Sequence, residues 1–132
     1  MAYIMLVEDD KDMRDLLETV IAMKGHEVST AGDGVEALIL MDLRFPQLVV
    51  TDVEMPRLDG PAMIYRMFIE NLGRENIPTI LISANVELPR IAEVVGTPYY
   101  LAKPFEIQSL TELIEVGLVE AQPPRPLGCM AR

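Results

Sequence analysis

The chain has 132 residues, half of them hydrophobic and 24% of them charged, which predicts one globular domain with a single core. Its 11 basic and 21 acidic side chains give a formal net charge of −10 at pH 7. Because nucleic acids and anionic membranes are bound mainly through Lys and Arg, this charge argues against both as partners.

The sequence also argues against export and against a membrane span. No apolar run approaches the roughly 18 residues needed to cross a bilayer, and residues 1–7 lack the basic flank of a signal peptide. The single cysteine, Cys129, has no internal partner for a disulfide. We therefore expect a soluble, cytoplasmic protein.

The first predicted strand spans residues 3–7 and leads directly into Glu8, Asp9 and Asp10. An amphipathic helix follows, for which we predict Asp10 as the N-cap and an end at Gly25. Its predicted buried face comprises Met13, Leu16, Leu17, Val20 and Ile21.

A short second strand is predicted over residues 27–31, and His26 in the turn before it is expected to be solvated. Asp33 stands three residues before Glu36, which is the spacing of a helix capping box. The helix that begins there is expected to bury Ala37, Leu38 and Met41.

Residues 48–52 give the clearest strand signal in the chain. Val49 and Val50 are β-branched and have no polar neighbour before Thr51, which favours a strand buried on both faces of a parallel sheet. Such a strand presents its last residue, Asp52, at the carboxyl edge of the sheet, where open α/β folds bind their ligands.

The loop after Asp52 ends in Asp59 and Gly60, which we expect to shape the turn into a third helix with Pro61 in its first turn. The predicted buried face of this helix comprises Met63, Ile64, Met67 and Phe68.

Two further strands are predicted, residues 79–82, ending at Ser83, and residues 99–102, ending at Lys103. Between them, a short helix stopped by Gly96 is expected to bury Leu88, Ile91, Ala92 and Val95. The last helix is expected to bury Leu110, Leu113, Ile114, Gly117 and Leu118.

Alternating strands and helices predict an α/β fold: a doubly wound, five-stranded parallel sheet with five helices in a three-layer αβα arrangement. We assign residues 1–121 to this domain. Three of the five residues after Gln122 are proline, so residues 122–132 are predicted to form an extended or disordered tail.

Polar side chains stand at four strand ends: Glu8 and Asp9, Asp52, Ser83 and Lys103. These ends share one edge of a parallel sheet, so we expect the side chains to converge. Carboxylates at about 4 Å repel one another by roughly 4 kcal/mol at an effective dielectric constant near 20, so the cluster needs positive charge. Mg²⁺, a hard cation that takes oxygen ligands, fits such a site together with the lysine. The set suits in-line attack of Asp52 on a phosphoryl group.

At this point the chain resembles a known family, the receiver domains of two-component response regulators, including the chemotaxis type. The resemblance covers roughly residues 1–121. The matching motifs are Leu6-Val7-Glu8-Asp9-Asp10, Thr51-Asp52-Val53-Glu54-Met55-Pro56-Arg57-Leu58-Asp59-Gly60, Ser83-Ala84, and Tyr100-Leu101-Ala102-Lys103-Pro104-Phe105. The family implies a flavodoxin-like sheet with strand order 2-1-3-4-5.

The resemblance implies that Asp52 is the phosphoacceptor. It implies that Asp9 binds Mg²⁺ directly, that Glu8 binds it through water, and that the backbone carbonyl of Glu54 is a further ligand beside Asp52.

The resemblance also implies a switch. The Ser83 hydroxyl would turn toward the acyl phosphate, Lys103 would pair with the phosphoryl group, and Tyr100 would change rotamer with them. The Lys103–Pro104 peptide bond would be cis. The interval from Ser83 to Tyr100 is short for the family, which predicts a clipped fourth helix.

The predicted function is therefore that of a phosphorylation-activated receiver. It would accept its phosphoryl group from a sensor histidine kinase or a histidine phosphotransfer protein and signal through an unknown output protein. It would catalyse only its own phosphorylation and dephosphorylation. Three alternatives stay open: a receiver excised from a larger hybrid kinase or multidomain regulator, a Mg²⁺-dependent phosphatase or phosphotransferase, and a scaffold that is never phosphorylated.

Overall fold

The computed structural model describes residues 1–127 and shows one parallel sheet of five strands in the order β2-β1-β3-β4-β5. The strands are β1 Tyr3–Val7, β2 Glu27–Ala31, β3 Leu48–Asp52, β4 Thr79–Ser83 and β5 Tyr100–Ala102. The helices are α1 Lys11–Met23, α2 Gly34–Leu43, α3 Gly60–Glu70, α4 Leu88–Val95 and α5 Ile107–Glu120, with a 3-10 turn η1 at Arg74–Asn76. This is the predicted flavodoxin-like fold.

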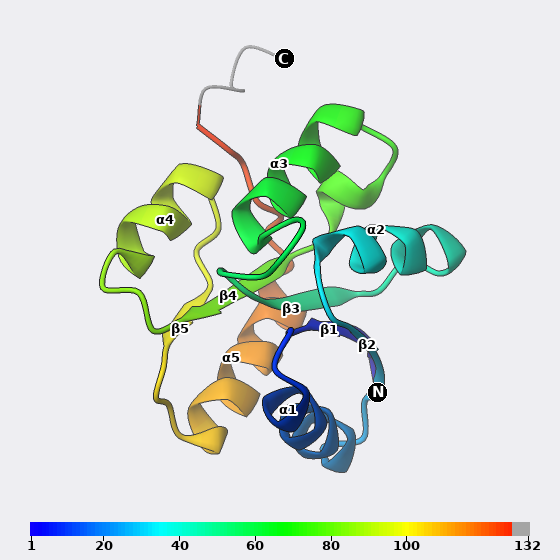
Figure 1. The fold of residues 1–132 in the computed structure, drawn as a ribbon. Helices are drawn as coiled ribbons and strands as arrows, with labels where there is room; N and C mark the ends of the chain where they lie inside the picture. The colour runs from blue at the N-terminus through cyan, green and yellow to red at the C-terminus, as the bar shows by residue number, and fades with distance from the viewer. Residues whose placement is uncertain (128–132) are drawn as a thin grey trace.

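Helices cover both faces of the sheet, with α1 and α5 on one face and α2, α3 and α4 on the other (Figure 1). The position of strand β1 between two helical layers explains why its residues are all hydrophobic. Ile4 and Leu6 join the core beneath α1 and α5, whereas Met5 and Val7 join the core beneath α2 and α3. Because successive side chains of a strand point to opposite faces, a central strand between two helical layers has no solvent side.

Three aspartates begin helices, as the sequence indicated for Asp10 and Asp33. The Asp10 carboxylate accepts from the Met13 N–H at 3.1 Å, and the Asp33 carboxylate accepts from the Glu36 N–H at 2.9 Å. The third, Asp59, is the N-cap of α3 and accepts from the Ala62 N–H at 2.8 Å. Each bond satisfies one of the backbone donors that a helix start leaves free.

Two predictions about α1 and its end were wrong. Leu16 has 49% of its surface exposed, because the sheet-facing stripe of α1 is centred on Leu17 and Ile21. His26 is not solvated: its side chain is only 8% exposed.

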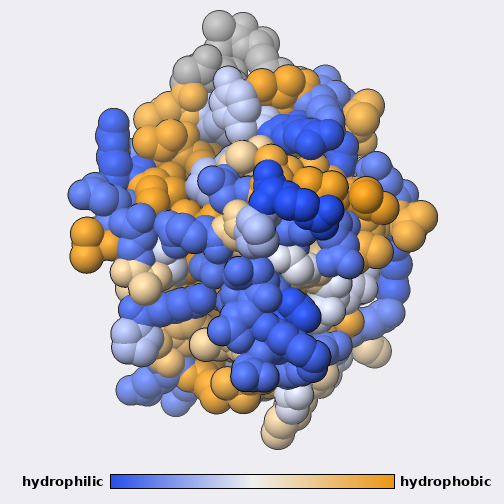
Figure 2. Space-filling view, in the orientation of Figure 1, coloured by the Kyte–Doolittle hydropathy of each residue, from blue (hydrophilic) through white to orange (hydrophobic). Residues whose placement is uncertain are grey.

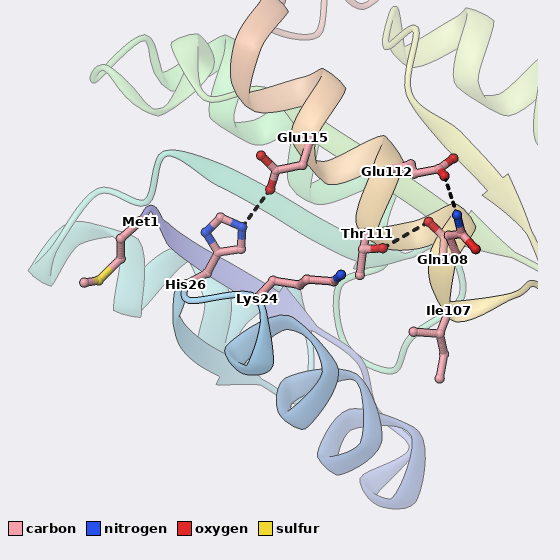
Figure 3. A pocket seen from close by; sticks show the side chains of 8 residues that line it. All are labelled: Met1, Lys24, His26, Ile107, Gln108, Thr111, Glu112 and Glu115. Atoms are coloured by element: carbon pink, nitrogen blue, oxygen red, sulfur yellow. Dashed lines mark hydrogen bonds and ion pairs between the residues drawn. The ribbon is translucent and has the colours of Figure 1, made fainter.

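His26 joins three parts of the fold. Its Nδ1 accepts from the backbone N–H of Ala2 at 3.1 Å, so Nε2 carries the ring proton and donates to Glu115 at 2.9 Å. The ring thereby links the start of β1 to α5 beside a groove of about 620 Å³ (Figure 3). Sequence periodicity gives no signal for such a contact, because its partners lie 24 and 89 positions away.

Beyond α5, residues 122–127 form an extended segment that packs against the domain. The N–H of Arg125 donates to the Gly96 carbonyl at 3.1 Å, and the N–H of Leu127 donates to the Val94 carbonyl at 2.8 Å. Pro124 and Pro126 are buried. The structure therefore shows packing for these six residues, where their composition suggested extended or disordered chain. Cys129 lies outside the described residues.

One face of the domain carries both hydrophilic and hydrophobic surface. In the view of Figure 2, hydrophilic residues occupy the middle of the face and hydrophobic residues gather toward its margins. Among the helices of residues 1–127, none is both long and apolar enough to cross a membrane.

Gly60 is required by a close approach of the backbone at the start of α3. Its N–H donates to the Val53 carbonyl at 2.9 Å, and a Cβ at this position would lie 2.5 Å from the backbone oxygen of Asp52. The first turn of α3 therefore packs directly against the end of β3.

We predict that Gly60→Ala lowers the free energy of unfolding by roughly 1–3 kcal/mol, because the added methyl group displaces backbone at the end of β3. Gly32→Ala is the matched control, since its Cβ would meet only side-chain atoms, at 3.6 and 3.7 Å. Urea denaturation of both variants measures the difference. Equal losses would contradict the proposed close packing.

Candidate functional site

Four strands deliver polar side chains to the carboxyl edge of the sheet. Strand β1 is followed by Glu8 and Asp9, β3 ends at Asp52, β4 ends at Ser83, and β5 is followed by Lys103 after Ala102. The register pairs Asp52 with Ile82 on one side, and the Lys103 N–H donates to the Ser83 carbonyl at 2.8 Å. The convergence expected from the strand ends is thus observed.

Lys103 lies between two of the carboxylates. Its Nζ is 3.1 Å from an oxygen of Glu8 and 3.3 Å from Oδ2 of Asp52. The three side chains are 22%, 1% and 11% exposed, respectively, so these ion pairs are largely shielded from solvent. The other Asp52 oxygen, Oδ1, accepts from the Val53 N–H at 3.0 Å, which fixes the plane of the carboxylate.

One lysine does not balance the cluster. Burial raises the pKa of Asp52, against the lowering effect of Lys103, and burial together with repulsion from Asp52 raises the pKa of Glu8. Burial opposes the charge of Lys103, but attraction to Asp52 and Glu8 outweighs it, so the pKa of Lys103 is raised. Burial therefore makes ionisation of these two carboxyl groups less favourable, whereas the neighbouring carboxylates stabilise the ammonium of Lys103.

The acidic cluster has the donors that a hard cation needs. Glu8, Asp9 and Asp52 each offer a carboxylate oxygen, and these oxygens lie within 4.8 Å of one another. Asp9 is exposed, whereas Glu8 is engaged by Lys103 and by the Asp10 N–H at 3.3 Å. An all-oxygen set with an exposed member suits Mg²⁺, which keeps several of its waters.

The Ser83 hydroxyl donates to the Glu54 carboxylate at 2.9 Å, and the Asn85 side-chain amide donates to the same carboxylate at 3.2 Å. Sequence reasoning named the backbone carbonyl of Glu54 but missed its side chain, and it missed Asn85 entirely. Asn85 also accepts from the Glu87 N–H at 2.8 Å, just before α4. An Asn three residues before Leu88, the first residue of the predicted helix, is a typical turn former, and that signal could have found it.

Tyr100 is 42% exposed on the edge strand β5. It pairs in register with Leu81, which packs beneath α3 and α4, whereas its neighbour Leu101 packs beneath α1 and α5. Tyr100 therefore lies on the α4 side of the sheet. The Lys103–Pro104 peptide bond is cis, as the resemblance implied.

The loop after Asp52 is fixed to the start of α2 by contacts that the sequence did not reveal. Arg57 has a φ of 65° and its Nε donates to Asp33 at 2.8 Å, while the Gly34 N–H donates to the Leu58 carbonyl at 2.9 Å. Burial alone would raise the pKa of Asp33, but the N–H of Glu36 and the Arg57 guanidinium lower it. These contacts hold the loop that leads from Asp52 to α3.

Sequence comparison identifies relatives of one kind. The sequence model of the response regulator receiver domain matches residues 4–115. The probable transcriptional regulator ycf27 of Cyanophora paradoxa is 38% identical over 123 residues, which cover 92% of this chain and 50% of that protein. Response regulator MprA of Mycobacterium sp. (strain KMS) is 34% identical over 122 residues, covering 91% and 52%. The chain thus spans about half the length of these curated relatives.

Solved structures agree. The receiver domain of the Francisella response regulator 1452 superposes with a TM-score of 0.82 at 27% identity, covering 92% of this chain and all of that one. The receiver domain of NtrX from Brucella abortus gives a TM-score of 0.78 at 29% identity, covering 88% and 98%.

We predict that Asp52→Asn raises the unfolding temperature at pH 7 by a few degrees in the absence of divalent cations. The raised pKa means that the folded chain binds the Asp52 proton more tightly than the unfolded chain does. Ionisation of this carboxyl group therefore lowers the free energy of unfolding as the pH rises. The gain of the variant should shrink as the pH falls and should vanish by about pH 3, which lies below the ordinary Asp pKa, because the carboxyl is then protonated in both states.

Calorimetry between these pH values measures the effect. Asp59→Asn is the control, because its cap oxygen is kept and it lies outside the cluster. If the gain grew on acidification, or if the variant were less stable than the wild type at pH 7, the raised pKa of Asp52 would be contradicted.

Proposed function

This chain belongs to the response regulator receiver domain family, and we propose that Asp52 is the residue on which it is phosphorylated. The observation that carries the proposal is the position of the Asp52 carboxylate, 3.3 Å from Lys103 and within 4.8 Å of oxygens of Glu8 and Asp9. Asp52 alone of the three carboxylates ends the central strand β3, in which all five residues are buried.

In the proposed reaction, an oxygen of Asp52 forms a bond to phosphorus while the bond from phosphorus to a histidine nitrogen of the donor breaks. The donor would be a sensor histidine kinase or a histidine phosphotransfer protein. Lys103, held 3.1 Å from Glu8, would pair with the phosphoryl oxygens. The Val53 N–H would keep the Asp52 carboxylate oriented through Oδ1.

Mg²⁺ fits the donor set of the cluster. We assign Asp9 and Asp52 as direct ligands, Glu8 as a ligand through water, and the Glu54 backbone carbonyl as a further ligand. When bound, the cation would offset negative charge on the cluster and on the transferring phosphoryl group.

Ser83 and Tyr100 are proposed to transmit the change. The Ser83 hydroxyl donates to Glu54 in this structure, so it would have to exchange Glu54 for a phosphoryl oxygen on activation. That exchange would also free one partner of Asn85, which contacts the start of α4. Tyr100 lies on the same side of the sheet as α4 and is half exposed, which leaves it room to change rotamer.

Receiver domains are signalling domains, and the output of this one is proposed to be a protein contact. Hydrolysis of its own acyl phosphate is part of the proposal. A phosphatase acting on external substrates is the less favoured alternative, because Glu8 and Asp52, the buried carboxylates of the cluster, are already paired with Lys103. The chain spans about half the length of its curated relatives. The alternative that it is the receiver domain of a larger regulator therefore stays open.

Incubation with Mg²⁺ and acetyl phosphate is expected to add one phosphoryl group to the wild type and none to Asp52→Asn, as measured by intact mass. Asp59→Asn, which alters a carboxylate outside the cluster, is expected to accept one group. A stable adduct on Asp52→Asn would show that another carboxylate is the acceptor.

Asp9→Ala is expected to weaken Mg²⁺ binding at least tenfold, or about 1.4 kcal/mol, because it removes the exposed carboxylate of the cluster. Asp10→Ala removes only a helix cap, so it should lower stability by about 1 kcal/mol and leave Mg²⁺ affinity almost unchanged. The rise of unfolding temperature with Mg²⁺ concentration measures both affinities. Equal affinities for the two variants would refute this division of roles.

A further inference from the structure

Residues 122–127, called the strap below, run from the end of α5 across the end of α4 toward α3 (Figure 1). Two backbone hydrogen bonds hold the strap to the end of α4, from Arg125 to the Gly96 carbonyl and from Leu127 to the Val94 carbonyl. Pro126 and Leu127 also line an apolar groove of about 480 Å³ between α3 and α4, opposite Tyr65 and Ile69 of α3.

Gly96 makes this path possible. It caps α4 in the left-handed conformation with a φ of 75°, and a Cβ there would lie 1.9 Å from the carbonyl oxygen of Arg125. No side chain fits between α4 and the strap at this point. The contact is therefore direct backbone packing over Gly96.

A second anchor holds the beginning of the strap. The Tyr99 hydroxyl is a buried group that accepts from the Gln122 N–H at 3.2 Å and donates to Glu120 at 3.1 Å. Ala121, with a φ of 51°, turns the chain from α5 into the strap. Since Tyr99 directly precedes Tyr100, the strap is tied to the strand that carries the proposed switch residue.

Helix α4 is thus held at both of its ends. Asn85 connects its start to the Glu54 carboxylate beside Asp52, and the strap holds its end at Val94 and Gly96. Helix α4 has only 8 residues, so the two attachments lie close to each other along the chain.

We propose that the strap holds α4 in the position seen here, and that a shift of α4 on phosphorylation requires release of the strap from Val94 and Gly96. This role rests on the proposed phosphorylation of Asp52. The strap and the phosphoryl group would favour different positions of α4, so each would weaken the hold of the other.

Amide hydrogen exchange of the full chain tests whether the strap is held. The N–H groups of Arg125 and Leu127 should exchange at least tenfold more slowly than in an unstructured peptide. Gly96→Ala should abolish that protection. Gly25→Ala is the matched control, because Gly25 also has a positive φ, of 90°, but its Cβ would meet nothing within 4 Å. Unprotected amides in the wild type, or equal behaviour of the two variants, would overturn the proposal.

Tyr99→Phe tests the second anchor without crowding the backbone, and it serves if Gly96→Ala does not fold. Loss of the hydroxyl removes the acceptor of the Gln122 N–H, so exchange at Arg125 and Leu127 should rise several-fold. Unchanged exchange in this variant would contradict an anchored strap.

Beryllofluoride with Mg²⁺, a mimic of the phosphoryl group, tests the regulatory step. Its binding should lower the protection of Arg125 and Leu127 at least threefold and change exchange within residues 83–105, with little change in α1. Bound beryllofluoride with an unchanged strap would overturn the strap's role while the proposed function stands. If the wild type failed to bind beryllofluoride, the proposed function and the regulatory role of the strap would both be overturned. The Gly96→Ala comparison would still show whether the strap is held against α4.

Discussion

The central constraint on the structure is that the carboxyl edge of the sheet brings together more negative than positive charge. Glu8 and Asp52 share the ammonium group of Lys103, with Asp9 beside them, and burial raises the pKa values of Glu8 and Asp52 despite this pairing. The repulsion within such a cluster must be resisted by the rest of the fold, and here the carboxylates lie at the ends of buried strands. The excess of negative charge at this edge of the sheet favours the proposed binding of Mg²⁺, which would offset it.

Much of this could be predicted from the sequence, because parallel α/β folds convert linear patterns into positions in space. Uninterrupted apolar runs such as residues 48–50 identify strands with two buried faces, and the residue that ends each run must lie at the ligand-binding edge. Asp52 and Lys103 were brought together by this rule alone. Helix starts at Asp10 and Asp33 followed from the chemistry of N-caps.

The contacts that the sequence did not reveal are long-range and depend on the path of loops. Asn85 meets Glu54 across 31 positions, and His26 meets Glu115 across 89. Neither pair follows from periodicity or composition, since each requires two loops or helix ends to take particular directions. The position of the strap was equally hard to predict. Its prolines predicted an extended chain, but nothing in their pattern indicated that the strap would pack against Gly96.

The glycine beneath the strap carries a comparative consequence. Because a Cβ at position 96 would collide with the backbone of Arg125, a homologous chain with any other residue there must displace either its carboxyl-terminal segment or the end of α4. The identity of one residue at the end of α4 would then sort members of the family by how α4 and the chain after α5 meet. Two receivers with the same cluster of carboxylates could in this way differ in which helical surface they leave uncovered.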